Sequence, residues 1–472
     1  MTSRYSLSGR VGVLLSLLVS VAAAQVPADP PSTAFNPSLQ TFIDPRALLA
    51  LGDRLLFNAF HPTIGQALWS ADPSRGTVSL LTEMRPGFRG ASPNGLTVFD
   101  GQVYFAADDG YNGVELWRSD GSKAGTRMVK DINPGPEASV PAFLTVFGGR
   151  LFFAAQDAQQ VYRLWATTGD AATTRPVAGA EALWNPQQFT VVGDKLYFTA
   201  TDRAAGNELW VLDSAASAPH RVKDIRPGPE DSVPSQLTAA GRHLFFSATD
   251  GVSGWELWKS DGTTAGTVLV KDIRPGVDAS RPAYMVASGD TVFFAAGDGA
   301  HGVELWTSDG TAAGTRLVKD INPGAGGSGA SYLTEVDGSV YFSATDGVHG
   351  RELWKSDGTE SGTIMVRDIR PGAESSLPTG LARVGRLLMF AATTADGNQQ
   401  PWQSDGTAAG TRRLGDIAAA GGLALASRYT AVAGRTAFVA QDASGHERLW
   451  LLQPSGEIRL LGEPLPGKQK LR

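Results

Sequence analysis

The sequence predicts an all-β fold, a β-propeller of four-stranded antiparallel blades. Two observations lead to this prediction: tryptophan recurs at a nearly constant interval, and each interval contains four short strand signals separated by turns. Successive tryptophans of the series are 48 residues apart except for one interval of 45. A period near 50 is typical of propellers or solenoids. The series consists of Trp69, Trp117, Trp165, Trp210, Trp258, Trp306, Trp354, Trp402 and Trp450.

One period shows the predicted blade. Residues 236–240, 243–248, 255–259 and 267–272 are short runs rich in β-branched and aromatic residues, and Gly-Arg, Asp-Gly and Ser-Asp-Gly-Thr turns separate them. Four antiparallel strands per period form a propeller blade. The helical periodicity that a helical solenoid needs is absent, and the period is too long for the rungs of a β-helix.

The number of copies predicts about nine blades, in a domain spanning residues 46–464. One ring of nine is favoured because copies four to nine keep the 48-residue spacing without a linker. Nine exceeds the usual four to eight blades. The alternatives are eight blades plus a partial one, or two smaller rings divided near residues 170–187, where the pattern fails.

The repeated tryptophans are predicted to be core residues. Each follows a leucine on the third strand, where alternation places neighbouring side chains on opposite faces of the blade. A large aromatic side chain there fills the gap to the next blade. The rival interpretation is a ring of exposed tryptophans that bind sugar.

Aspartates recur at two turn positions. The aspartates at the third position after the tryptophan are mostly followed by glycine, which predicts a structural turn. The aspartates at the eighth position before the tryptophan end the second strand, on the same face of the propeller as the Pro-Gly loops between blades. An oxygen-rich rim of this kind could hold Ca²⁺, so the weak metal candidates are Asp109, Asp250, Asp298 and Asp346. Turn capping is the alternative role, and otherwise no cofactor is expected.

Glutamates recur two residues before the tryptophan, and aspartates recur 14 residues after it. Because the same charges occur in most blades, they cannot mark one unique active site. We expect them to be structural and to pair with the Lys or Arg of the Lys-Asp-Ile strand. The glutamates are Glu115, Glu208, Glu256, Glu304 and Glu352.

The N-terminus has the pattern of a cleaved Sec signal peptide, residues 1–24. Arg4 and Arg10 precede a short apolar run that ends in three alanines, and cleavage is predicted after Ala24. The apolar run is too short for a transmembrane helix, and no later stretch reaches that length. We therefore expect a secreted or periplasmic protein, with a Pro-rich linker at 25–45 and a C-terminal tail at 465–472.

Composition excludes several kinds of chemistry. The chain has no cysteine, so disulfides, thiolate metal sites and a cysteine nucleophile are excluded. The formal net charge is −6 and there is no polybasic run, which argues against nucleic acid as the main partner. GxSxG and P-loop motifs are both missing, and the six histidines lack metalloprotease spacing.

A catalytic or ligand-binding site needs residues that are not repeated, and the third copy departs most from the pattern. It lacks the Glu-Leu-Trp glutamate, the Asp-Gly turn and the Lys-Asp-Ile strand, and the next copy has the shortened spacing. The candidate ligand-binding residues are Tyr162, Arg163, Trp184 and Trp255. No catalytic residue stands out.

The string Glu-Leu-Trp-Lys-Ser-Asp-Gly-Thr at residues 256–263, repeated nearly unchanged from residues 304 and 352, resembles the bacterial ELWxxDGT repeat family. Its members are secreted proteins sometimes labelled hyalin-like. The resemblance covers about residues 46–464 and implies a secreted repeat protein with propeller-type repeats. It implies no reaction and no functional residue.

Two functions follow as expectations. The main one is a non-catalytic binding or surface-interaction module for a glycan, a peptide or a cell-envelope component. The alternative is a propeller-type hydrolase or lyase that acts on extracellular polysaccharide, with its site in the irregular third and fourth copies. An arginine, a tyrosine and two carboxylates from non-repeated positions, gathered in the central pocket of the ring, would favour the enzyme, and a pocket lined only by repeated residues would oppose it.

Overall fold

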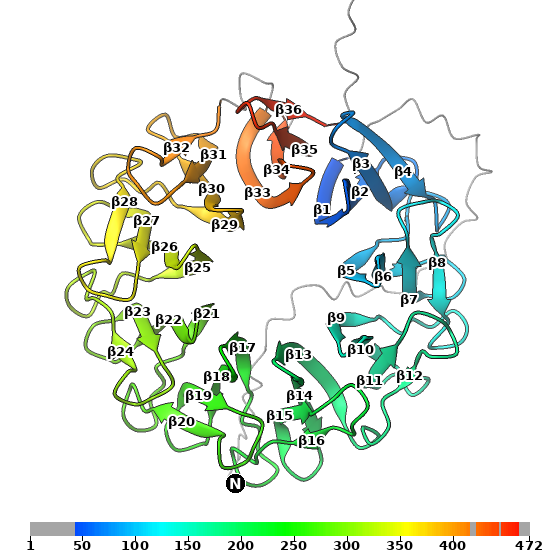
Figure 1. Ribbon diagram of the computed structural model, residues 1–472, viewed down its shortest axis with the longest axis horizontal. Coiled ribbons are helices and arrows are strands. Elements are labelled where there is room, and N and C mark those ends of the chain that lie inside the picture. Colours follow the sequence, from blue (N-terminus) through cyan, green and yellow to red (C-terminus); the bar gives the residue numbers. More distant parts are fainter. Residues whose placement is uncertain (1–42, 416–421, 443–444, 462–472) are drawn as a thin grey trace, which may run out of the picture. The chain divides into compact units, whose positions relative to one another are not determined.

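The computed structural model describes residues 43–415, 422–442 and 445–461, which form nine four-stranded antiparallel sheets arranged in a ring (Figure 1). Every sheet contains four strands that are consecutive in the chain. The propeller prediction is confirmed, and one ring of nine replaces the alternatives of eight blades or two rings. The predicted signal peptide, the linker up to residue 42 and the tail at 465–472 lie outside the described residues. Within those residues, no helix has the length and apolarity needed to cross a membrane.

The first strand of each blade is the innermost one in the ring (Figure 1). Each of these strands has at least one register shift against its neighbour, and β1, β13 and β33 have two, so the ladder is interrupted by bulges. The innermost strands are β1 (Ile43–Leu51), β5 (Asn94–Phe99), β9 (Ala142–Phe147), β13 (Trp184–Val192), β17 (Ser235–Ala240), β21 (Ala283–Ser288), β25 (Ser331–Val336), β29 (Thr379–Val384) and β33 (Gly422–Val432).

The second strand is the most buried. Its central residues, often Phe-Phe or Tyr-Phe followed by small residues, are covered on both faces by the neighbouring blades, which explains the continuous apolar run. The second strands are β2 (Arg54–His61), β6 (Gln102–Asp108), β10 (Arg150–Gln156), β14 (Lys195–Asp202), β18 (His243–Thr249), β22 (Thr291–Gly297), β26 (Ser339–Thr345), β30 (Leu387–Thr393) and β34 (Arg435–Asp442).

The third strand carries the Leu-Trp pair, and the fourth is a short edge strand. The third strands are β3 (Gly65–Asp72), β7 (Val114–Ser119), β11 (Tyr162–Thr167), β15 (Gly206–Leu212), β19 (Trp255–Ser260), β23 (Val303–Ser308), β27 (Arg351–Ser356), β31 (Gln399–Ser404) and β35 (Glu447–Leu452). The fourth strands are β4 (Thr77–Thr82), β8 (Arg127–Lys130), β12 (Arg175–Pro176), β16 (His220–Arg221), β20 (Val268–Lys271), β24 (Arg316–Leu317), β28 (Ile364–Arg367), β32 (Arg412–Arg413) and β36 (Ile458–Leu460).

The hydrophobic core lies between adjacent blades. Trp258 of blade 5 packs in one cluster with Leu209, Val222 and Ile225 of blade 4. Eight of the nine repeated tryptophans are buried and Trp117 is partly buried, so the core interpretation is confirmed and the exposed sugar-binding ring is wrong. Each blade therefore gains most of its stability from its neighbours, as in other repeat folds.

A cationic side chain in or just after the fourth strand strengthens this packing. The Lys223 ammonium lies 5.8 Å from the ring centroid of Trp258 and donates to the Thr267 carbonyl at 2.8 Å, both in the next blade. Lys130, Lys271 and Arg367 make the same pair of contacts with the blades that follow them. A cation over an indole adds to the affinity between blades.

The ring closes by packing between blades 9 and 1. Trp69 and Leu55 of blade 1 share a buried cluster with Val432 and Leu449 of blade 9. Arg459 of β36 donates to the Pro73 carbonyl at 3.0 Å. Among the strands that the structure describes, β1–β4 and β33–β36 form two separate complete blades, and none of them joins the sheet of the other blade.

The repeated glutamates are buried, but the predicted pairing with Lys or Arg is wrong. The Glu256 carboxylate accepts hydrogen bonds from the Ile273 amide at 2.9 Å, from the Ser280 amide at 2.8 Å and from the Ser280 hydroxyl at 2.6 Å. Glu115 and Glu352 make the same three contacts in their blades. The carboxylate thus anchors the loop that leads to the next blade.

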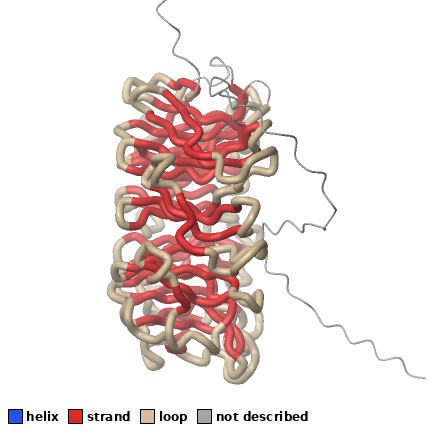
Figure 2. The backbone as a smooth tube through the Cα atoms, turned by 90° about the vertical axis from the view of Figure 1, so that its right-hand side faces the viewer, coloured by secondary structure: helices blue, strands red, loops and turns tan. Residues whose placement is uncertain are grey.

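The loops gather at the two faces of the ring, as the edge-on view shows (Figure 2). Because the strands of a blade alternate in direction, loops after the second and fourth strands share one face, which we call the Asp-loop face. The Ser-Asp-Gly-Thr hairpins lie on the other face. There, the Asp261 carboxylate accepts from the amide and hydroxyl of Thr263 at 2.8 and 2.7 Å, which confirms the structural turn.

Candidate functional site

The irregular third copy forms a groove between blades 3 and 4 on the Asp-loop face. We call it the 3–4 groove; it measures about 480 Å³ and its lining is mainly apolar. Its lining residues are Arg163, Glu181, Ala182, Trp184, Asp202, Arg203 and Ala204. It brings together an indole, two carboxylates and two guanidinium groups. The cluster that the sequence associated with an enzyme differs from this one, because it had a tyrosine in place of the indole and lay in the central pocket of the ring.

The groove exists because an arginine replaces the repeated glutamate. Arg163 stands two residues before Trp165, where five other blades have a buried glutamate. A carboxylate accepts hydrogen bonds from loop amides, whereas a guanidinium only donates. Arg163 accordingly donates to the Leu183 and Glu181 carbonyls at 2.8 and 3.0 Å. The loop must present carbonyl groups here, so it follows a different path from the Pro-Gly loops of the regular copies.

The Arg163 guanidinium is also paired with a carboxylate of its own blade. Its Nε atom lies 3.0 Å from the Asp157 Oδ2 atom. With three acceptors around it, Arg163 is a positioning residue that holds the wall of the groove. Its charge is balanced by Asp157, so it adds no net positive charge for a ligand.

The two carboxylates of the groove differ in their freedom. The Asp202 carboxylate accepts from the Ala204 and Ala205 amides at 2.8 and 2.7 Å and from Arg221 at 3.2 Å, so its position is fixed. The Glu181 side chain is exposed and accepts from the Gly179 amide at 3.1 Å. Hydrogen bonds from the amides of Glu181 itself and of Gly179 lower the pKa of Glu181, which keeps this carboxyl ionised.

The remaining groups supply an aromatic surface and a cation. Trp184 is the first residue of β13 and is half-buried, so part of its indole stays accessible beside the groove. Arg203 is exposed and forms no ion pair within the described part of the chain. An aromatic surface, an ionised carboxylate and a free guanidinium are thus presented together.

Only two of the four predicted ligand-binding residues line this groove. Arg163 and Trp184 do, but Tyr162 does not, because it precedes Arg163 on the strand and alternation turns it to the other face. Trp255 lies on β19 of blade 5 and is 36% exposed there. Glu181 and Arg203 were not among the residues predicted from the sequence. The arginine at the glutamate position was the signal for this groove.

The four candidate metal ligands cap their own loops. Asp109 and Asp250 each accept from two amides of the loop that follows them. Asp298 and Asp346 do the same, and each also contacts the histidine three residues later at 2.7 Å. Among the described residues, no group of three or more His, Cys, Asp or Glu side chains could hold a metal ion. These carboxylates act as turn caps.

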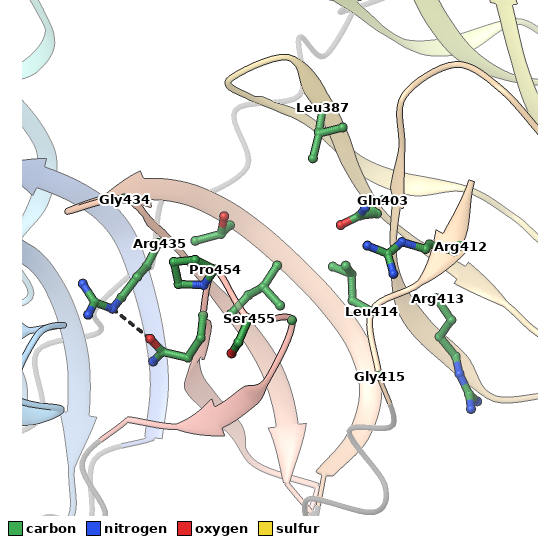
Figure 3. Close-up of a pocket in the computed structure, with 14 residues that line it drawn as sticks. Leu387, Gln403, Arg412, Arg413, Leu414, Gly415, Gly434, Arg435, Pro454 and Ser455 are labelled. Carbon is green, nitrogen blue, oxygen red and sulfur yellow. Dashed lines mark hydrogen bonds between the residues drawn. The ribbon is translucent and has the colours of Figure 1, made fainter. Parts of the chain in front are cut away.

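A second groove, between blades 8 and 9, differs from the 3–4 groove in its chemistry. Figure 3 shows Arg435 donating to Gln453, at 2.9 Å, whereas the Arg413 side chain points away from Arg412. Its volume is about 290 Å³ and no carboxylate is among its lining residues. Without a carboxylate it offers no general base, so the 3–4 groove is the better candidate for catalysis.

No protein-family model matches the chain, and no curated protein matches it. Solved structures do resemble it. A puromycin hydrolase mutant in complex with PGG matches with 13% identity over 78% of this chain and 59% of that chain, with a TM-score of 0.40. A prolyl endopeptidase matches with 11% identity over 68% of this chain and 49% of that one, with a TM-score of 0.42.

The β-propeller domain of the Trilobed protease from Pyrococcus furiosus, described as having an open velcro topology, is also similar. It shares 12% identity over 80% of this chain and 99% of that chain, with a TM-score of 0.39. This chain spans about three fifths of the puromycin hydrolase and half of the prolyl endopeptidase. At these identities the likeness concerns the fold alone.

These neighbours correct the main functional expectation. The sequence favoured a non-catalytic binding or surface-interaction module, but the similar structures come from hydrolases and peptidases. The main expectation is therefore not kept, and the alternative of a propeller-type hydrolase or lyase is taken up below as a proposal.

Proposed function

We propose that the chain is a propeller-type hydrolase or lyase that cleaves extracellular polysaccharide in the 3–4 groove. The observation that carries this proposal is the composition of the groove. Glu181, Trp184 and Arg203 gather beside the fixed Asp202 carboxylate, only where the repeat fails. A structural role in blade packing would not need this set of exposed groups.

Each group has a role in the proposed reaction. The exposed face of Trp184 stacks against a sugar ring and orients the polymer in the groove. Glu181 is the exposed carboxylate of the groove and serves as the base. In hydrolysis it takes a proton from the water that bonds to the anomeric carbon as the glycosidic C–O bond breaks; in elimination it takes a proton from the sugar carbon beside the one whose C–O bond breaks. In both reactions the departing oxygen takes up a proton from solvent. Arg203 places a positive charge where negative charge develops on the substrate. Asp202 fixes the loop that carries Arg203.

The two reaction types leave different products, so one experiment tests the proposal. The purified chain is incubated with a panel of neutral and acidic polysaccharides. New reducing ends without ultraviolet absorbance indicate hydrolysis, and an unsaturated product that absorbs near 235 nm indicates elimination. We expect one of these products, lost on Trp184→Ala and retained on Trp255→Ala, the control in a regular blade. Absence of cleavage across the panel would refute the proposal.

A further inference from the structure

Each innermost strand has a residue with a left-handed backbone at an equivalent position, and β1 and β13 each have a second one, Asp44 and Asn185. The equivalent residues sit at a bulge of the strand, one per blade, with φ between 50° and 67°. The residue that follows each of them packs in the core between blades, as Leu237, Met285 and Leu333 do. The equivalent left-handed residues are Ala47, Gly95, Phe143, Gln188, Gln236, Tyr284, Tyr332, Gly380 and Arg428.

This position is strained for most of its occupants. A left-handed backbone costs a residue other than glycine roughly 1–2 kcal/mol. Gly95 and Gly380 show that the fold accepts glycine here. Tyr284 and Tyr332 nevertheless carry large side chains that are each 48% exposed. Since half-exposed side chains gain little free energy from burial, the presence of tyrosine at these two strained positions needs another explanation.

Tyr284 and Tyr332 form a pair across blades 6 and 7. Their ring centroids are 6.0 Å apart, with 44° between the ring planes. The pair lies on β21 and β25, two neighbouring innermost strands of the ring (Figure 1). Two tilted, half-exposed aromatic rings present an apolar surface with phenol groups, which suits the face and the hydroxyl groups of a sugar.

A positive charge without a counter-ion lies next to this pair. The Arg351 guanidinium donates to the carbonyls of Gly329, Ser343 and Ser328 at 2.9, 3.0 and 3.2 Å. Within the described residues it forms no ion pair. Burial lowers its pKa. Its Nη1 atom lies 3.5 Å from the hydroxyl of Ser331, the residue before Tyr332, so the guanidinium lies at the start of β25 beside the pair. A half-buried cation that is bound only by neutral groups attracts an anion.

We infer that Tyr284, Tyr332 and Arg351 form a subsite for a negatively charged sugar, a uronate unit of the polymer. The tyrosines contact the sugar ring and Arg351 neutralises its carboxylate. This inference rests on the proposed function, which names a polysaccharide as the substrate. The subsite narrows the substrate class to acidic polysaccharides. The subsite holds the polymer at blades 6 and 7, apart from the groove in which it is cleaved.

Calorimetric titration of the full chain with polygalacturonate tests the subsite, with methyl-esterified polygalacturonate as the neutral comparison. We expect the acidic polymer to bind at least tenfold more tightly than the ester, with affinity falling as salt rises. The double variant Tyr284→Ala, Tyr332→Ala should bind the acidic polymer at least tenfold more weakly. Gln236→Ala, at the same position of blade 5, should bind as the parent does.

The inference would be overturned by equal binding of the two polymers, by unchanged affinity of the double variant, or by no binding at all. Binding of the acidic polymer is also measured with Glu181→Gln, so that a failure of the proposed cleavage and a failure of the proposed subsite can be told apart. If this polymer binds through the tyrosines but is never cleaved, the proposed function fails and the subsite stands. If the polymer is cleaved but the tyrosines do not affect binding, the subsite fails alone.

Discussion

Replacing one buried glutamate tests how the blades are joined. Glu256 is fully buried, and its carboxylate accepts hydrogen bonds from the Ile273 amide and from the amide and hydroxyl of Ser280. In Glu256→Ala, these three buried donors lose their acceptor. Each unsatisfied buried donor costs about 1–3 kcal/mol, so the free energy of unfolding should fall by about 3 kcal/mol or more.

The assay is urea denaturation followed by tryptophan fluorescence, which reports on the packing between blades. Glu360→Ala is the matched control, because Glu360 is an exposed glutamate in a hairpin loop; it should change the free energy of unfolding by less than about 0.5 kcal/mol. Glu256→Gln should lie in between, since its amide keeps one acceptor oxygen. If Glu256→Ala were as stable as Glu360→Ala, the carboxylate would not anchor the loop and the reasoning would be refuted.

Three further predictions concern pH, core packing and metal. Burial raises the pKa of Glu115 and Glu208 to about 7 from 4.5, and raises the pKa of Glu256, Glu304 and Glu352. The folded chain therefore binds protons more tightly than the unfolded chain, so the free energy of unfolding should fall as the pH rises from about 5 to 7.5. The double variant Glu115→Gln, Glu208→Gln should show a flatter pH profile. A free energy of unfolding that rises with pH in this window would contradict this prediction. Trp258→Ala should cost about 3–5 kcal/mol in denaturation because it empties the core between blades 4 and 5, whereas Trp184→Ala should cost less than about 1 kcal/mol; equal losses would place Trp184 in the core. Finally, EDTA should leave the melting temperature unchanged, because the Asp-loop carboxylates cap turns; a marked drop would restore the calcium rim.

The fold was predictable because its physical causes repeat. Blade packing demands an aromatic side chain once per blade, so the series from Trp69 to Trp450 fixes the period, and the strands predicted in one copy agree with β17–β20 to within a residue or so at most ends. The role of Glu256 was harder to predict. Its partner Ser280 lies 24 residues away, and only the folded loop brings the two together.

The candidate site was only partly predictable. The irregular third copy pointed to Arg163 and Trp184, both of which line the 3–4 groove. Glu181 was missed, because nothing in its local sequence shows that its loop forms part of the 3–4 groove. Tyr284 and Tyr332 were missed because their significance lies in a left-handed backbone, and residue type alone does not reveal this.

The most direct test of the central claim is the initial rate of polysaccharide cleavage by Glu181→Gln, compared with Glu230→Gln in a regular Pro-Gly loop. The account predicts that Glu181→Gln loses at least 100-fold in rate, the usual contribution of a general base. Glu230→Gln should retain the rate of the parent chain. If Glu181→Gln cleaved the polymer as fast as Glu230→Gln does, the 3–4 groove would not be the catalytic site.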